Sequence, residues 1–422
     1  MKFSDNFIIG AATAAHQVEG NNLYSDYWAQ EHMDCTSFSE PSGIACDHYN
    51  RYEEDIRLLA EAGLNAYRFS IEWARIEPQP GQFDESETEH YRRVLECCRA
   101  NGVTPIVTMH HFTSPQWLIA GGGWESEATV EKFANYCRYI AEKLGSLMTY
   151  VCTINEANIG IQIAAIAKRY AGNAAKNLQI GLNVENPQAE RAKKFAEENT
   201  RVFGTASPQI FTSPRTAEGD KLVTRAHMAA KAAMKAVCPH LQIGLTLSLH
   251  DIQPTAGGEG NAAGEWNDEF THYLPCIADD DFLGVQNYTR TLVGLDGSLP
   301  VPDSAETTQM GYEFYPEALG NVIRAVHKSL KIPLIVTENG IATADDTRRT
   351  AFIERALHGV ADCIEEGIPV LGYLYWSLLD NFEWQKGYAM TFGLVGVDRE
   401  TMERRPKPSL AYLGGFMRRE SI

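Results

Sequence analysis

Eight short apolar segments, rich in β-branched and aromatic residues, recur along the chain and alternate with longer amphipathic stretches. Near-continuous apolar strands separated by helices are typical of a parallel sheet that helices cover. Several amphipathic stretches end in a glycine just after the last periodic residue, the usual carboxyl-terminal cap of a helix. The segments that we expect to contain the strands are residues 7–16, 65–73, 103–111, 150–157, 242–250, 281–289, 333–340 and 370–380.

Eight strand–helix units is the number that closes a (β/α)8 barrel. Such barrels need ~250 residues and exceed ~400 with insertions, so 422 residues fit one catalytic domain spanning 1–422. The alternative, a doubly wound open sheet, normally carries G-x-G-x-x-G after its first strand, where this chain has GAATAAH. We therefore predict the α/β class and a single (β/α)8 TIM barrel with loop insertions at the carboxyl ends of the strands. The longest gap, from Glu156 to Gln242, is expected to hold a rim insertion with a solvated surface helix.

Composition limits the partners. With 37 Lys and Arg against 55 Asp and Glu, the net charge is −18, which repels nucleic acid and anionic membranes. The amino terminus lacks the features of a secretory signal, and the longest apolar run is about half a membrane span. Nine cysteines without any C-x-x-C indicate reduced thiols and a cytoplasmic protein. We expect no nucleic-acid or membrane partner, and the sequence makes no prediction of the oligomeric state.

The active site of such a barrel lies at the carboxyl ends of its strands. Glu156 ends the fourth strand and Glu338 the seventh, three positions apart around the ring, so the two should face one another. Opposed carboxyl groups, one protonated and one ionised, are what glycoside hydrolysis requires. Burying them in apolar segments without a purpose would be costly.

The other side chains at the strand ends suit a sugar, because its ring offers apolar faces for stacking and hydroxyls for hydrogen bonds. Indoles and hydrogen-bonding groups both occur there. The candidates are Gln17, His111, Asn155, Trp376, Glu383 and Trp384.

Three segments resemble the signatures of glycoside hydrolase family 1, the β-glucosidase family: TINEAN from Thr153, VTENG from Val336 and YWSLLDNFEW from Tyr375. Further segments match in order, namely QVEG, YRFSIEWARIEP, MHHF and RRPKPS, so the resemblance covers essentially the whole chain. It implies a retaining β-glycosidase that hydrolyses terminal non-reducing β-D-glucosyl residues, with galactosyl and fucosyl residues as further candidates. It also implies small-molecule β-glycosides as substrates, double displacement through a covalent glycosyl-enzyme, and no metal or organic cofactor.

The resemblance implies a role for each matched residue. Glu338 resembles the nucleophile and Glu156 the general acid/base, ~5–5.5 Å apart in a retaining enzyme. Tyr288 matches a tyrosine that hydrogen-bonds the nucleophile, and Arg68 a buried arginine beside it. We expect both to lower the pKa of Glu338, whereas the pKa of Glu156 should be raised. The residues that match the sugar-binding set are Gln17, His111, Asn155, Glu383 and Trp384, with Trp376 as the platform.

Two departures from the family pattern concern the entrance. Ala157 stands where a proline usually follows the acid, so the placement of Glu156 must rely more on packing. Phe112 stands where a tryptophan is usual.

Glu383 would repel a 6-phosphate, and residues 389–391 (Ala-Met-Thr) provide no lysine to bind one, so we predict an unphosphorylated sugar.

Two alternatives remain. A metal-dependent barrel hydrolase could use His16, His111 and His250, which all end strands, although the usual His-x-His pair on the first strand is absent. A sugar-binding relative without activity is suggested by Ala157 and Phe112, although both carboxylates are present.

Overall fold

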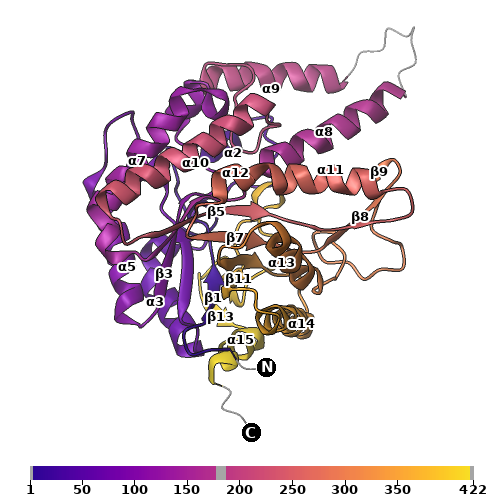
Figure 1. Cartoon of the computed structure of the whole chain (residues 1–422). Coiled ribbons are helices and arrows are strands. Elements are labelled where there is room, and N and C mark those ends of the chain that lie inside the picture. Colours follow the sequence, from indigo (N-terminus) through magenta and orange to yellow (C-terminus); the bar gives the residue numbers. More distant parts are fainter. Residues whose placement is uncertain (1–2, 177–186, 419–422) are drawn as a thin grey trace.

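The computed structural model describes residues 3–176 and 187–418, and at its centre eight parallel strands close a barrel (Figure 1). Each expected segment contains one of these strands, so the predicted (β/α)8 barrel is confirmed. Around the ring the strands follow their order in the chain, and β4 and β10 are three positions apart, as predicted. The barrel strands are β1 (Ile8–Ala12), β2 (Ala66–Ser70), β3 (Thr104–His110), β4 (Tyr150–Ile154), β5 (Gln242–Ser248), β7 (Phe282–Gln286), β10 (Leu334–Asn339) and β11 (Val370–Trp376).

The strands are buried on both faces, which explains their continuous apolar sequences. Alternate side chains fill the inside of the barrel, where they form a cluster separate from the layer beneath the helices. At Gly10 the backbone of β1 comes so close to β2 that a Cβ atom would lie 1.9 Å from the carbonyl oxygen of Ala66. Only glycine fits there. The inner cluster includes Ile106, Cys152, Phe282, Ile335 and Leu374.

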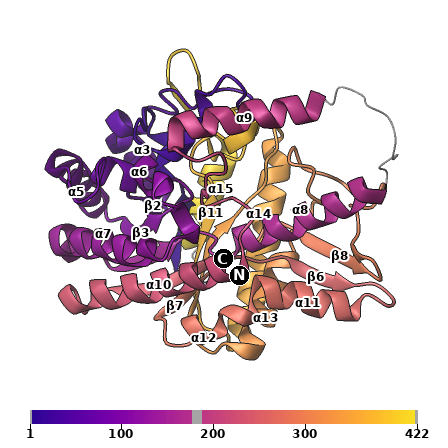
Figure 2. The ribbon, with the colours of Figure 1, turned by 90° about the horizontal axis from the view of Figure 1, so that it is seen from above.

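Long amphipathic helices cover the outside of the barrel (Figure 2). Some of them begin at a side chain that accepts backbone N–H groups, as Asp84 does from Ser86 and Glu87, and Asp345 from Thr347. These helices are α3 (His48–Ala62), α5 (Glu85–Ala100), α7 (Ala128–Leu144), α10 (Ala217–Val237), α13 (Ala318–Ser329), α14 (Asp346–Glu365) and α15 (Pro408–Arg418).

Shorter elements form the loops. Strands β6 (Asp251–Pro254), β8 (Arg290–Gly294) and β9 (Gly297–Ser298) make one small sheet, and β12 (Val395–Val397) pairs with β13 (Arg404–Pro406). The short helices are α1 (Ala15–Val18), α2 (Asp26–Glu31), α4 (Trp73–Ile76), α6 (Gln116–Ala120), α11 (Glu259–Glu269) and α12 (Leu274–Ile277). The 3-10 turns are η1 (Gly123–Glu125), η2 (Gly145–Leu147), η3 (Thr271–Tyr273) and η4 (Trp384–Lys386).

The expected rim insertion follows β4 and contains α8 (Ile159–Lys176) and α9 (Pro187–Phe203), which lie above the barrel in Figure 1. The outer face of α9 is solvated, as expected, but its inner face packs: Phe195 and Phe203 join Met33 and Ile119 in a small cluster. Residues 177–186, which link the two helices, are outside the described part of the chain. In that part, no helix combines the length and apolarity needed to cross a membrane.

Candidate active site

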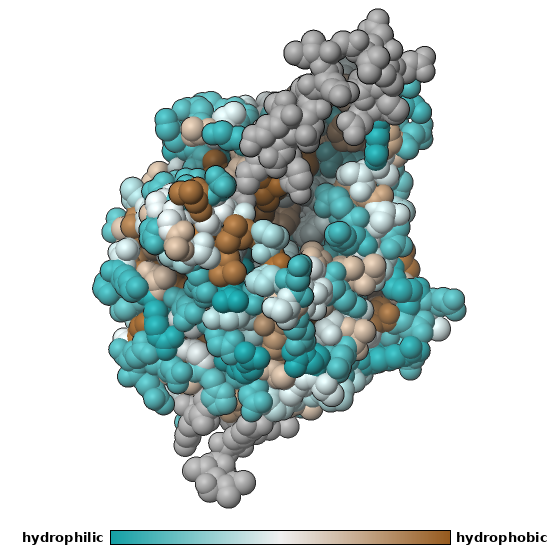
Figure 3. Space-filling view, turned by 90° about the vertical axis from the view of Figure 1, so that its right-hand side faces the viewer, coloured by the Kyte–Doolittle hydropathy of each residue, from teal (hydrophilic) through white to brown (hydrophobic). Residues whose placement is uncertain are grey.

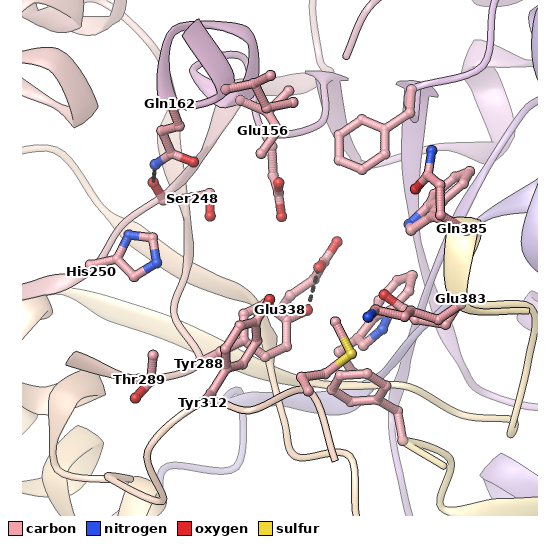
Figure 4. A pocket seen from close by; sticks show the side chains of 18 of the residues that line it. Glu156, Gln162, Ser248, His250, Tyr288, Thr289, Tyr312, Glu338, Glu383 and Gln385 are labelled. Carbon is pink, nitrogen blue, oxygen red and sulfur yellow. Dashed lines mark hydrogen bonds between the residues drawn. The ribbon is translucent and has the colours of Figure 1, made fainter. Parts of the chain in front are cut away.

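A cavity of about 460 Å³ opens at the carboxyl ends of the barrel strands (Figure 4). Most of the predicted site residues line it, namely His111, Glu156, Tyr288, Glu338, Trp376, Glu383 and Trp384. The remaining three, Gln17, Arg68 and Asn155, are fully buried behind the cavity wall. Each of the three hydrogen-bonds residues that line the cavity, so the structure brings the whole predicted set together.

Glu338 lies near the end of β10 with only 3% of its surface exposed, and both carboxylate oxygens have donors. Arg68 Nη1 on β2 donates to Oε1 at 2.5 Å, and the Tyr288 hydroxyl after β7 donates to Oε2 at 2.7 Å. These contacts hold the carboxyl group in one orientation. Figure 4 shows it facing Glu156 across the cavity.

The side chain of Asn155, next to Glu156 in the chain, is linked to Glu338 through Arg68. Its Oδ1 atom accepts from Arg68 Nη2 at 2.5 Å and from Gln286 Nε2 at 2.7 Å, and its Nδ2 atom lies 3.2 Å from His111 Nε2. We did not predict Gln286. Strand periodicity could have indicated it, because Gln286 is two residues before Tyr288 and thus on the same face.

Glu156 follows β4 in an unusual conformation, with φ at +44° in the left-handed region. Its backbone N–H donates to Thr246 Oγ1 at 3.0 Å, and the next N–H, that of Ala157, donates to the Thr246 carbonyl oxygen at 3.0 Å. The sequence led us to expect that packing would place this residue. Two directed hydrogen bonds contribute as well.

The two carboxyl groups titrate differently. Burial, and then the charge of Glu338, raise the pKa of Glu156 well above its ordinary value, with Arg68 opposing them. Burial also raises the pKa of Glu338, although Arg68 and the Tyr288 hydroxyl favour its anion. The expected lowering for Glu338 is thus wrong in net direction, because desolvation outweighs both partners. The Arg68 and Tyr288 contacts favour the anion of Glu338, whereas the charge of Glu338 favours the protonated form of Glu156, as the assignment of nucleophile and acid requires.

A third carboxyl group, that of the partly buried Glu383, lies beside the pair. Burial and the charge of Glu338 raise its pKa to about 8. Gln17 Nε2 lies 3.5 Å from Glu383 Oε2 and donates to the Phe382 carbonyl oxygen at 2.8 Å. Within the described residues, Gln17 Oε1 and His111 Nδ1 are buried without a hydrogen-bond partner, and such atoms are costly unless a ligand satisfies them.

Aromatic rings form the walls around these groups. His111 stacks on Trp376 with ring centroids 5.6 Å apart, and Phe112 packs against Trp384 at 5.2 Å. A flat apolar wall next to hydrogen-bonding groups is the surface that a sugar ring needs.

The three histidines of the metal alternative have other partners. His16 Nε2 is 2.7 Å from Glu31, His250 Nδ1 is 2.8 Å from Glu269, and His111 pairs with Asn155. In residues 3–176 and 187–418, no three His, Cys, Asp or Glu side chains are grouped so as to hold a metal ion. The side chains proposed for that alternative are not brought together.

Sequence reasoning missed the outer part of the cavity. Its walls include side chains from α8, from the loop before α13 and from η4, none of which ends a barrel strand. The missed residues include Ile159, Gln162, Ile163, Ile166, Met310, Tyr312 and Lys386.

A (β/α)8 barrel that presents two opposed carboxyl groups with different hydrogen-bond partners in an aromatic cavity has the architecture of a glycoside hydrolase. The chain belongs to glycosyl hydrolase family 1, whose model matches residues 1–421. At the level of the family, the predicted retaining β-glycosidase is confirmed. This assignment replaces both alternatives, the metal-dependent hydrolase and the inactive sugar-binding relative.

Individual relatives agree with the family. The β-glucosidase of Agrobacterium sp. is 29% identical, with 97% of this chain and 94% of the relative aligned. A bifunctional β-D-glucosidase/β-D-fucosidase of Bifidobacterium breve is also 29% identical, over 99% and 98%. The crystal structure of the β-glycosidase BGL167 superposes with a TM-score of 0.90 at 46% identity, covering 99% of this chain and 97% of that one.

Proposed function

We propose that this enzyme removes terminal non-reducing β-D-glucosyl residues, with Glu338 as nucleophile and Glu156 as general acid/base. The observation that supports this most directly is the unequal environment of the two carboxyl groups. Glu338 is held by the Arg68 cation and the Tyr288 hydroxyl. Glu156 faces it with a pKa well above the ordinary value. One group is therefore set to attack while the other donates a proton.

The reaction takes two displacements. A carboxylate oxygen of Glu338 attacks the anomeric carbon while the bond to the glycosidic oxygen breaks and Glu156 donates its proton to that oxygen. The glycosyl ester no longer carries the Glu338 charge, so the repulsion that kept Glu156 protonated disappears. Glu156 then takes a proton from water, the water oxygen attacks the anomeric carbon, and the ester bond to Glu338 breaks. Both steps invert, and the product retains the β configuration.

The same proposal assigns the sugar to the inner end of the cavity. Trp376 would stack on its ring, and the hydroxyls would bind Gln17, His111, Asn155, Glu383 and Trp384. The two unpartnered atoms, Gln17 Oε1 and His111 Nδ1, support this because hydroxyls would satisfy them. The names of the relatives support glucosyl substrates and keep fucosyl ones as candidates. Residues 389–391, Ala-Met-Thr, provide no cation for a phosphate, which favours an unphosphorylated sugar.

We further propose that residues 1–422 form one catalytic domain acting in the cytoplasm on small-molecule β-glycosides. One closed barrel that runs from β1 to β11 supports the single domain. All nine cysteines lie in the described residues and are free thiols, which supports a reducing compartment.

The test of the catalytic assignment is Glu338→Gly assayed with and without azide on an activated aryl β-glucoside. We expect a loss of at least ~10⁴-fold without azide and a partial return with it, because azide fits the space left by the carboxylate. The product should be the α-glucosyl azide, formed by a single inversion. Glu96→Gln, an exposed change on α5, is the matched control. Absence of rescue and of the glycosyl azide would contradict the nucleophile assignment.

A further inference from the structure

We propose that Thr246 of β5 is a positioning residue that sets the acid/base group by fixing the backbone of Glu156. The proposal rests on the proposed role of Glu156. Thr246 is fully buried and does not line the cavity, so it acts through its neighbour and has no contact with a substrate there.

The hydrogen bonds around Thr246 join β4 and β5 beyond the point where their regular backbone pairing ends. The regular pairing of β4 with β5 ends at Cys152 and Gly244, before either strand reaches the cavity. Beyond that point, Thr246 Oγ1 accepts the N–H of Glu156 at 3.0 Å and donates to the Ile154 carbonyl oxygen at 3.2 Å. The Thr246 carbonyl oxygen accepts the N–H of Ala157 at 3.0 Å. Thr246 thus hydrogen-bonds the backbone of three of the four residues from Ile154 to Ala157, while the Asn155 N–H donates to the His110 carbonyl oxygen.

Glu156 needs such a restraint because its φ of +44° is a conformation that L-residues with a Cβ atom rarely adopt. The neighbouring residue makes the restraint available. Ala157 has an N–H to donate to Thr246, whereas a proline at this position would have none. In this chain, therefore, hydrogen bonds to Thr246 restrain the backbone of Glu156. The family usually has a proline after this residue.

The restraint matters for proton transfer. A general acid must lie within hydrogen-bond reach of the glycosidic oxygen, and a backbone rotation at Glu156 would move its carboxyl group out of line. The Thr246 hydroxyl also lies 3.4 Å from Asn155 Oδ1, but the nucleophile is held directly by the shorter hydrogen bonds from Arg68 and Tyr288 and would keep its position. Loss of the Thr246 hydroxyl should therefore impair protonation of the leaving group more than nucleophilic attack.

The experiment compares Thr246→Val with Thr246→Ser on two aryl β-glucosides. Dinitrophenolate leaves without a proton, whereas phenolate needs one. For Thr246→Val we expect kcat/KM to fall ~30-fold on phenyl β-glucoside and less than ~3-fold on the dinitrophenyl substrate. Thr246→Ser keeps the hydroxyl and should stay within ~3-fold of the wild type on both. Thr108→Val, the same change at a buried threonine of β3, controls for loss of a buried hydroxyl.

Equal losses on both substrates, or a serine variant as impaired as the valine variant, would overturn the proposal. A second variant tests the hydrogen bond from the Ala157 N–H to the Thr246 carbonyl oxygen. In Ala157→Pro the ring would collide with the Thr246 carbonyl oxygen, so we expect the same preference for the dinitrophenyl substrate. Wild-type behaviour in this variant would also overturn the proposal.

The proposed role of Glu156 is tested separately. Glu156→Ala should spare the dinitrophenyl substrate and gain activity with azide, independently of Thr246. If Glu156→Ala behaves in this way and Thr246→Val does not, the positioning proposal alone is wrong. If Glu156→Ala shows no dependence on the leaving group, the acid/base assignment itself is wrong.

Discussion

The inner and outer ends of the cavity are built in opposite ways. At the inner end, charged side chains at strand ends are buried and hydrogen-bonded: Arg68 has no exposed surface and Glu338 has 3%. At the outer end, apolar side chains come from α8 and a loop, and 48% of Ile166 and 38% of Tyr312 are exposed. In Figure 3, hydrophobic residues border the hollow on this face of the molecule. Under the proposed function, bond cleavage depends on buried charged side chains at strand ends, and leaving-group selection on partly exposed apolar side chains.

Substitutions at the two ends of the cavity should therefore change different properties of the enzyme. At the inner end, altering one group leaves another buried and unpaired, and this is costly. At the outer end, a side chain contributes through contact area, so that a substitution changes affinity in proportion to the surface that a leaving group covers. The following variants test this difference between the inner and outer ends of the cavity.

The largest effect is expected at Arg68. In Arg68→Met, Glu338 loses its cation and Asn155 a donor, so the pKa of Glu338 should rise further. Leaving one partner of a buried ion pair alone costs ~3–5 kcal/mol of stability. We expect the transition state to lose a comparable stabilisation, so that kcat/KM should fall at least ~100-fold. The acid limb of the pH profile should move to higher pH.

The matched control for that experiment is Arg75→Met. Arg75 also makes a buried ion pair, with Glu19 at 2.9 Å, but neither residue lines the cavity. We expect a lower melting temperature with kcat/KM near the wild-type value. If both variants lost activity equally, burial of charge would matter only for folding, and the contrast between the two ends would fail.

Burial of the Glu383 carboxyl at the inner end should make the free energy of unfolding depend on pH. The pKa of Glu383 is about 8 in the folded protein against an ordinary 4.5. Its contribution to stability is therefore complete below pH 4.5 and is lost as the pH rises through about 8. Urea unfolding should show a free energy that falls by up to a few kcal/mol more in the wild type than in Glu383→Gln over this range.

Some decline should remain in Glu383→Gln, because the raised pKa values of Glu156 and Glu338 act in the same direction. The exposed change Glu96→Gln should leave the wild-type slope intact. Parallel curves for Glu383→Gln and the wild type would show that Glu383 is already ionised at pH 5.

At the outer end, an apolar side chain of α8 should affect binding of the leaving group. Ile163 lines the cavity from α8, so Ile163→Asn should weaken binding of an apolar leaving group. Burial of a methylene is worth ~0.8 kcal/mol, so kcat/KM for hexyl β-glucoside should fall ~10-fold. Methyl β-glucoside, whose leaving group does not reach α8, should change less than ~2-fold. Met228→Gln, an exposed apolar position on α10 that does not line the cavity, is the control. Equal losses on both glucosides would contradict an apolar outer site.

The contrast also explains what the sequence could predict. Strand ends converge by topology, so Glu156 and Glu338 could be placed opposite one another before any coordinates were known. The direction of α8 depends on packing between distant segments, so Ile163 and Ile166 carried no signal in the sequence. The net pKa of Glu338 was mispredicted for a related reason. Its partners could be named from the sequence, whereas its desolvation depends on the whole fold.

The smallest effect on activity is expected at Phe112, where the two ends meet. Only 8% of Phe112 is exposed, its φ is +69°, and its ring packs between Trp384 at 5.2 Å and Phe211 at 6.0 Å. In Phe112→Trp, the family residue would be too large for this space, and overpacking should cost ~1–3 kcal/mol of stability, measured by urea unfolding. The catalytic groups have their own hydrogen bonds, so kcat/KM should change less than ~3-fold, and equally for methyl and hexyl β-glucoside. A change in the ratio of the two substrates would instead make Phe112 part of the outer end and move the boundary between the ends inward to Trp384.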